Sequence, residues 1–293
     1  MNKKDFCMSW WITFIAMLIV LSSSFIFGRD ADSEHYYLSS FIGEFLMIIP
    51  IVIGIIPLIL QKRMNEISFR GFSPKLLILA ALIPIASQPF INLFITPINA
   101  VTEFLFDTGA DTTLPAATNT GEMILKILTL LVVAPILEEI LCRGILMQYL
   151  KRYGLAVSLI VSSLCFALLH FDPTSLVVIF FVGMLLGMIK VSTGSLWASI
   201  IAHSVNNLIA MTEFSDTAST VIFVVSVVLF PILLYFFMKL MPDTYKNRLK
   251  FKKGEKIGFS TGAVLSFSVY GILSFALVIM KLSSYLMHSG ILF

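Results

Sequence analysis

The chain has 293 residues, of which 58% are hydrophobic and 13% are charged, and its net charge is +3. Soluble globular domains contain about 45–50% apolar and about 25% charged residues, so this composition excludes an ordinary water-soluble domain. No basic patch with interleaved aromatic residues is present, which argues against nucleic-acid binding. The three cysteines lie in or beside apolar runs, and their odd number predicts no disulfide framework. We therefore expect an integral membrane protein.

The apolar runs predict the fold class. Runs of roughly 17–23 residues are long enough to cross a hydrocarbon core of about 30 Å as helix. We expect one all-α integral membrane domain over residues 1–293, a polytopic transmembrane bundle of about eight or nine spans. The expected spans are Met8–Phe27, Phe41–Leu60, Leu76–Ile98, Met123–Leu146, Leu155–His170, Ser175–Ile189, Leu196–Met211, Val221–Met238 and Phe259–Met280.

The distribution of Lys and Arg predicts the orientation, because cytoplasmic loops carry an excess of these residues. With a cytoplasmic N-terminus, the basic residues fall inside and most acidic residues outside, which predicts nine crossings and an outside C-terminus. The run Met8–Phe27 is too long for a signal-peptide core and predicts a retained helix. We expect a multi-pass protein of the cell membrane, with the basic loop 239–258 lying against anionic lipid headgroups.

A few ionisable residues interrupt the apolar spans. A charged side chain at the centre of a membrane helix costs about 2.5–3.5 kcal/mol, so such residues are candidates for a functional site. Glu139 and Arg143 are four residues apart, which predicts a charge-compensating pair on one helix face. Glu138 points about 100° away around the same helix, so its partner must come from another helix.

Two later spans supply candidate partners. His170 ends one span, while His203 and Asn207 share one face of another. From the helical rise, the depths of Glu138, His170 and His203 agree only within about 10 Å, so the spans must tilt to bring them level. A carboxylate and two imidazoles can activate a water directly or on a metal ion, and a carboxamide can stabilise an oxyanion. These groups are sufficient for peptide-bond hydrolysis.

Other protease types are disfavoured. No H-E-x-x-H motif is present, and no Ser or Cys nucleophile is adjacent in sequence to a base on the same face. Ser204 follows His203 directly and so cannot share its helix face.

The polar residues form three ordered motifs: Glu138-Glu139-x-x-x-Arg143, Phe166-x-x-x-His170 and His203-x-x-x-Asn207. They resemble those of the CAAX protease and bacteriocin-processing family, also called the Abi family. The motifs are short, but all three occur in order and each lies inside an apolar span. The resemblance covers residues 123–211, which we expect to form the catalytic core region.

The resemblance implies an intramembrane peptidase, either glutamate-dependent or metallo-type, built as an all-helical bundle with a site that opens towards the cytosol. Glu138 would be the general base, His170 and His203 would position the water or a metal that carries it, and Asn207 would stabilise the oxyanion. Glu139 would act with them, supported by Arg143 and Phe166. The implied cofactor is a divalent metal such as zinc, held by His170 and His203.

The implied substrate is a peptide or a membrane-anchored protein, as in bacteriocin processing, and we do not predict a prenylated one. Two alternatives stay open. A non-proteolytic scaffold or bacteriocin immunity protein would regulate a partner membrane protein and would not need Glu138. A transporter would use the buried groups for ion coupling, but it predicts two pseudo-symmetric halves, and the sequence contains no internal repeat.

Overall fold

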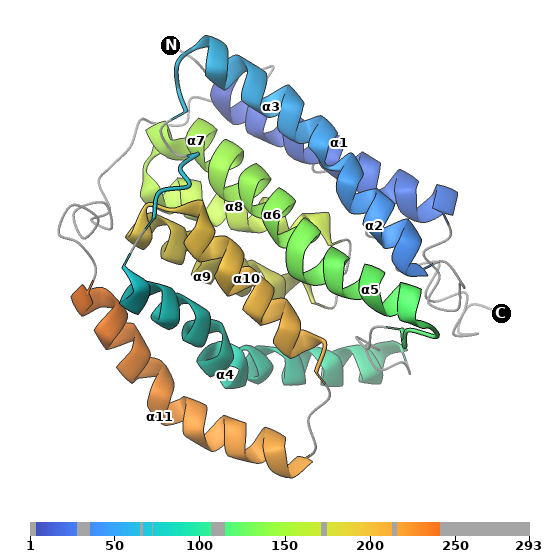
Figure 1. The fold of residues 1–293 in the computed structure, drawn as a ribbon, viewed down its shortest axis with the longest axis vertical. Coiled ribbons are helices and arrows are strands. Elements are labelled where there is room, and N and C mark those ends of the chain that lie inside the picture. Colours follow the sequence, from blue (N-terminus) through green and yellow to red (C-terminus); the bar gives the residue numbers. More distant parts are fainter. Residues whose placement is uncertain are drawn as a thin grey trace.

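The computed structural model describes residues 4–27, 36–64, 67–71, 73–106, 115–170, 175–212 and 216–240. Over these ranges the chain folds into helices and contains no strand, which confirms the all-α class (Figure 1). The elements are α1 (Lys4–Phe27), α2 (Tyr36–Leu46), α3 (Ile48–Leu60), α4 (Pro74–Phe106), α5 (Thr120–Leu128), η1 (Thr129–Val133), α6 (Ala134–Glu139), η2 (Ile140–Leu146), α7 (Met147–Leu150), η3 (Lys151–Tyr153), α8 (Leu155–Leu169), α9 (Leu176–Thr193), α10 (Leu196–Ala210) and α11 (Asp216–Leu240).

The expected spans correspond to these helices. Eight of the nine fall on helical segments, and the ninth, Phe259–Met280, lies outside the described residues. Three helical stretches among the described residues are long and apolar enough to cross a membrane: Tyr36–Leu60, Leu176–Thr193 and Val221–Leu240. The number of crossings, the side of the N-terminus and the extent of the single domain stay predictions.

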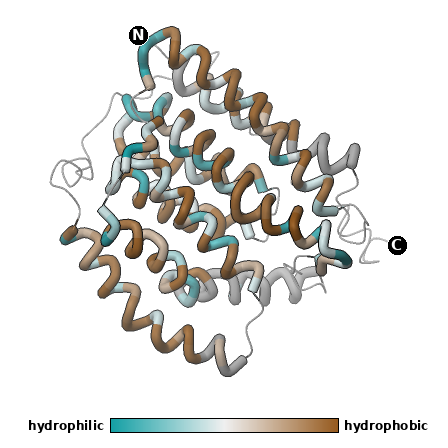
Figure 2. Tube along the Cα trace, in the orientation of Figure 1, coloured by the Kyte–Doolittle hydropathy of each residue, from teal (hydrophilic) through white to brown (hydrophobic). Residues whose placement is uncertain are grey.

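The helices pack into a bundle with apolar flanks. Helices α1, α2 and α3 lie together on one side, and α11 lies against α4 on the other (Figure 1). Between these flanks α8 packs on α9, and α10 packs on α4, α9 and η1. Apolar residues dominate α3 and α11 (Figure 2), and many of their large side chains are exposed. Such exposed apolar flanks suit a hydrocarbon environment.

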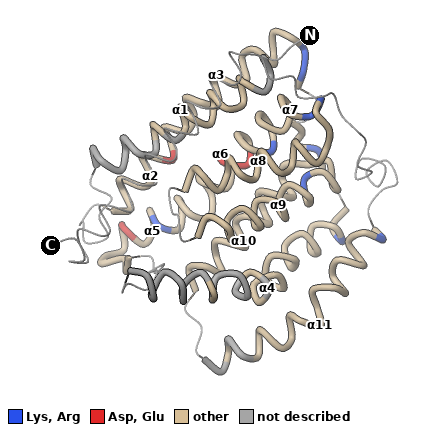
Figure 3. The backbone as a smooth tube through the Cα atoms, turned by 180° about the vertical axis from the view of Figure 1, so that it is seen from behind, with Lys and Arg blue, Asp and Glu red and all other residues tan. Residues whose placement is uncertain are grey.

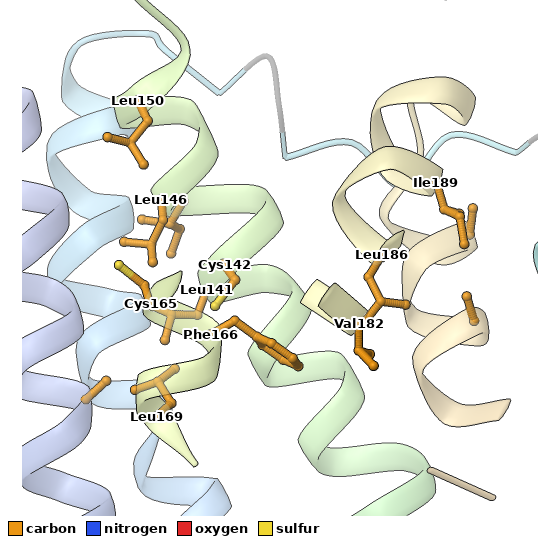
Figure 4. Close-up of a cluster of buried hydrophobic side chains, with 14 of the residues drawn as sticks. Leu141, Cys142, Leu146, Leu150, Cys165, Phe166, Leu169, Val182, Leu186 and Ile189 are labelled. Atoms are coloured by element: carbon orange, nitrogen blue, oxygen red, sulfur yellow. The ribbon is translucent and has the colours of Figure 1, made fainter. Parts of the chain in front are cut away.

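The centre of the bundle is closely packed. Leu141, Cys142 and Leu146 of η2 lie beside Phe166 of α8 and Leu186 of α9 (Figure 4), and all five side chains are almost fully buried. This core holds α8 and α9 against the helix that carries the two consecutive glutamates.

That helix begins at Thr120 with a capped N-terminus. The Asn119 side-chain oxygen accepts a hydrogen bond from the Glu122 N–H at 3.0 Å, and the Glu122 carboxylate accepts one from the Thr118 N–H at 2.7 Å. These two bonds satisfy backbone donors that have no partner within the helix. From Thr120 the helical path continues to Leu150, beyond both ends of the predicted span Met123–Leu146.

The turn between α9 and α10 fixes the start of the helix that carries His203. Gly194 ends α9 in the left-handed conformation with φ 69°, which glycine adopts without a Cβ clash. Ser195 is extended, and the N–H of Leu196 donates to the Ser68 carbonyl at 2.8 Å. The first turn of α10 is therefore tied to the chain segment before α4.

Candidate active site

Two π-helical segments flank the consecutive glutamates. Glu138 and Glu139 are the last residues of α6, with η1 before it and η2 after it. A π-helical turn departs from the regular α-helical hydrogen-bond ladder, and such turns occur frequently at functional sites. The sequence reasoning assumed a regular helix throughout this span and missed both segments. The residues of η1, Thr-Leu-Leu-Val-Val, carry no composition signal that marks them.

Arg143 is a fully buried cation at the centre of the site. Its Nη1 lies 2.7 Å from a carboxylate oxygen of Glu139, which confirms the predicted pair. Its Nη2 donates to the Gly183 carbonyl at 2.9 Å, and its guanidinium lies 4.3 Å from the centroid of the Phe166 ring. An ion pair, a backbone carbonyl and an aromatic face stabilise this buried charge, while its Nε has no hydrogen-bond partner.

His203 lies between the two carboxylates. Its Nδ1 is 3.2 Å from Glu139 Oε1 and its Nε2 is 3.8 Å from Glu138 Oε2, and all three side chains are buried. The prediction that Glu138 takes its partner from another helix is thus confirmed. Neither contact has hydrogen-bond geometry. His203 Nδ1 and Glu138 Oε2 therefore have no hydrogen-bond partner. These are unsatisfied polar atoms in a closely packed interior, which is uncommon away from functional sites.

Phe166 connects the two histidines of the predicted site. Its ring makes edge contacts with the imidazole of His170, at 4.9 Å between centroids, and with that of His203, at 5.4 Å. His170 caps α8, is exposed, and holds its Nδ1 2.9 Å from the Phe166 carbonyl. The structure thus places His170 against Phe166 at the edge of the buried cluster.

Asn207 and Ser204 bond to carbonyls of the first π-helical segment. The Asn207 carboxamide donates to the Leu130 carbonyl at 2.9 Å, and the Ser204 hydroxyl donates to the Leu131 carbonyl at 2.8 Å. Ser204 also donates to Ile200 on its own helix. These bonds join α10 to η1 directly after His203 and one turn beyond it. They leave one N–H of the Asn207 carboxamide for another acceptor.

The structure brings together Glu138, Glu139, Arg143, Phe166 and His203, with Asn207 one turn away and His170 joined through Phe166. Their roles in catalysis stay predictions. The expected mismatch in depth does not separate Glu138 from His203, since their side chains lie 3.8 Å apart.

Sequence reasoning missed two neighbours of this cluster. Gly183 contributes only a carbonyl, which leaves no side-chain signal. Ser199 is fully buried next to the Glu139 carboxylate. It stands four residues before His203, just as Asn207 stands four after, so a search for polar residues at this spacing would have found it.

Comparison with known proteins supports the family. Residues 120–209 match the family described as type II CAAX prenyl endopeptidase Rce1-like. The predicted resemblance to this family is confirmed over residues 120–209. The comparisons found no matching curated protein and no matching solved structure. The segment matched to the CAAX endopeptidase family spans α5 to α10 and contains every residue of the buried cluster.

A metal site was tested against the side chains present. Among the described residues, no three His, Cys, Asp or Glu side chains are grouped so that they could hold a metal ion. In this arrangement His203 directs both ring nitrogens at carboxylates, and His170 lies against Phe166. The residues as arranged do not fit the predicted zinc on His170 and His203, which stays a prediction, and no step below passes through a metal.

The buried ion pair makes a stability prediction. Arg143→Met removes the cation and leaves the Glu139 carboxylate buried, so we expect a loss of about 3–5 kcal/mol in the free energy of unfolding. The double variant Glu139→Gln/Arg143→Met should recover most of that loss, because no uncompensated charge remains. Equilibrium unfolding in mixed detergent micelles measures both. A single variant as stable as the wild type would show that the pair contributes nothing.

Gly183 makes a second prediction, with a control on the same helix. A Cβ on Gly183 would lie 3.1 Å from Ser163 Cβ and 3.2 Å from both Ser163 Cα and a Phe166 ring carbon, so α8 and α9 must shift. A Cβ on Gly187 would meet only the end of the flexible Leu159 side chain, at 2.8 Å. We expect Gly183→Ala to lower the free energy of unfolding by about 1–3 kcal/mol, and Gly187→Ala by less. Equal losses would contradict this account.

Proposed function

We propose that this protein is an intramembrane endopeptidase in which Glu138 activates a water molecule for attack on a peptide bond. The observation that carries the proposal is the pairing of the glutamates. Each glutamate has a buried oxygen without a hydrogen-bond partner, but Glu139 is neutralised by Arg143, whereas Glu138 pairs with no Lys or Arg among the described residues. Its Oε2 lies 3.8 Å from the His203 imidazole. The match to a family of endopeptidases over the same residues supports this reading.

In the proposed reaction, the Glu138 carboxylate accepts a proton from water while the water oxygen bonds to the carbonyl carbon of the substrate. A separation of 3.8 Å between Glu138 Oε2 and His203 Nε2 is too long for a direct hydrogen bond, and suits a water that bonds to both. Glu139 faces Nδ1 of His203 and orients the imidazole, as the third group does in other acid–base sites.

The tetrahedral intermediate needs a donor for its oxyanion and a proton for its leaving amine. The second N–H of the Asn207 carboxamide is one donor, and His170, at the exposed edge of the cluster, is another. Glu138 returns its proton to the leaving nitrogen as the C–N bond breaks. The substrate class that we propose is a peptide or protein with a membrane-anchored segment, because the catalytic groups lie within a bundle that has apolar flanks.

The test compares Glu138→Gln with Glu122→Gln. Both changes remove a carboxylate from the same helix, but Glu122 lies at the exposed capped end. The proteins are reconstituted with membrane-anchored peptides that carry a fluorophore and a quencher on either side of candidate bonds. Glu138→Gln should reduce the cleavage rate by about 10²–10⁴-fold, since a general base contributes this much. Glu122→Gln should leave the rate near that of the wild type.

Undiminished cleavage by folded Glu138→Gln would refute the assignment. If the wild type cleaves nothing, and its cellular phenotype survives Glu138→Gln, the protein is a scaffold or immunity protein instead. Circular dichroism and size-exclusion chromatography show whether each variant is folded.

A further inference from the structure

A short segment before α4 connects two of the helices that form the site. We call residues 67–71 the strap. Ile67 packs where the missing side chain of Gly144 leaves space, since a Cβ there would be 3.3 Å from Ile67 and 3.7 Å from Leu196. The Ser68 carbonyl accepts the N–H of Leu196 at 2.8 Å. The strap therefore touches both the helix of Arg143 and the first residue of the helix of His203.

The strap carries one ring of an exposed aromatic pair. Phe69 and the Trp197 side chain of α10 meet edge to face, with 5.4 Å between ring centroids. Phe69 is 43% exposed and Trp197 is 44% exposed. Exposing nearly half of a large aromatic side chain to water is unfavourable, because its apolar surface is not buried. Trp and other aromatic residues are favoured at the boundary between lipid headgroups and acyl chains.

Positive charge surrounds this pair. Arg70 follows Phe69, and Lys62 and Lys75 stand at the ends of the two helices that the segment connects; all three are exposed. The one acidic residue of this segment, Glu66, lies outside the described residues. Figure 3 shows most of the blue Lys and Arg segments at the end of the bundle where α7 lies, whereas red segments lie on α2 and α5. Exposed cations beside exposed aromatic rings complement an anionic lipid surface.

We propose that the strap is a lipid-binding anchor: Phe69 and Trp197 insert at the headgroup boundary, and Arg70 and Lys75 bind the phosphates of anionic phospholipids. The exposed ring of Phe69 is followed directly by the exposed cation Arg70, and the exposed Lys75 stands at the start of α4. The Ser68 carbonyl bonds to the first residue of α10, and Ile67 packs at Gly144 of η2. Through these two contacts the anchor sets the depth of the site helices in the bilayer.

The chain offers a direct reporter of this contact. It contains three tryptophans, Trp10, Trp11 and Trp197. In the variant Trp10→Phe/Trp11→Phe, Trp197 is the one remaining source of tryptophan fluorescence. The full-length variant is reconstituted into vesicles of phosphatidylcholine, with and without phosphatidylglycerol, and quenched by lipids brominated near the headgroup, by lipids brominated deep in the chain, or by aqueous acrylamide.

We expect stronger quenching by the shallow brominated lipid than by the deep one, with protection from acrylamide that increases when phosphatidylglycerol is present. Arg70→Gln/Lys75→Gln should weaken that increase, because each cation removed lowers the affinity for the anionic surface about fivefold. Lys126→Gln is the matched control, because Lys126 lies on α5, over the Tyr37 ring of α2. It should leave the increase unchanged.

Three results would overturn the proposal. Free access of acrylamide to Trp197 in vesicles would place the pair in water. Protection from both acrylamide and brominated lipid would mean that another polypeptide segment covers it. Equal quenching with and without phosphatidylglycerol would show that the strap does not bind anionic lipid. If the double Trp variant does not fold, the difference between wild type and Trp197→Phe gives the same signal. No step requires cleavage, so the outcome is independent of the proposed peptidase activity.

Discussion

Arg143 is the constraint around which the centre of this protein is built. A guanidinium without solvent exposure is costly unless its charge and its N–H groups find partners. Here Glu139 supplies the charge, α9 supplies a backbone carbonyl, and α8 supplies an aromatic face. Three separate helices therefore have to pack at fixed positions around one cation. The small residues at the α8–α9 contact follow from this demand, because Gly183 must approach closely enough to offer its carbonyl.

The two consecutive glutamates have different surroundings as a result. Glu139 has its charge balanced by Arg143 and also faces His203. Glu138 makes no ion pair with Arg143. Each glutamate has one carboxylate oxygen without a hydrogen-bond partner, so the ion pair is what distinguishes them. The charge of Glu139 is therefore compensated by a cation, whereas the charge of Glu138 is not. A buried carboxylate oxygen without a hydrogen-bond partner binds an incoming donor more strongly than a solvated oxygen does. This asymmetry favours Glu138 over Glu139 as the group that handles the reacting water.

The sequence predicted the contacts of the two glutamates where residue spacing and charge determine them. Two residues four apart with opposite charges pair on a helix, and a buried carboxylate without a local partner must find one elsewhere, so Glu139–Arg143 and Glu138–His203 could be inferred. The helical spans followed from apolar run length. The π-helical segments could not be inferred, because Leu, Val and Ile fill α- and π-helical turns equally well. The contact with the Gly183 carbonyl was equally invisible, since main-chain acceptors are present at every position.

The position of His203 depends on how α10 is held at both ends. At its start, the N–H of Leu196 is bonded to the strap. Asn207, one turn beyond His203, bonds to the η1 carbonyl of Leu130, and Ser204, directly after His203, bonds to that of Leu131. Rotation of α10 about its axis would break both sets of contacts together, so the imidazole stays between the carboxylates. The π-helical segment thus provides acceptors that fix the histidine-bearing helix, and the same chain path then delivers Glu138 to that histidine.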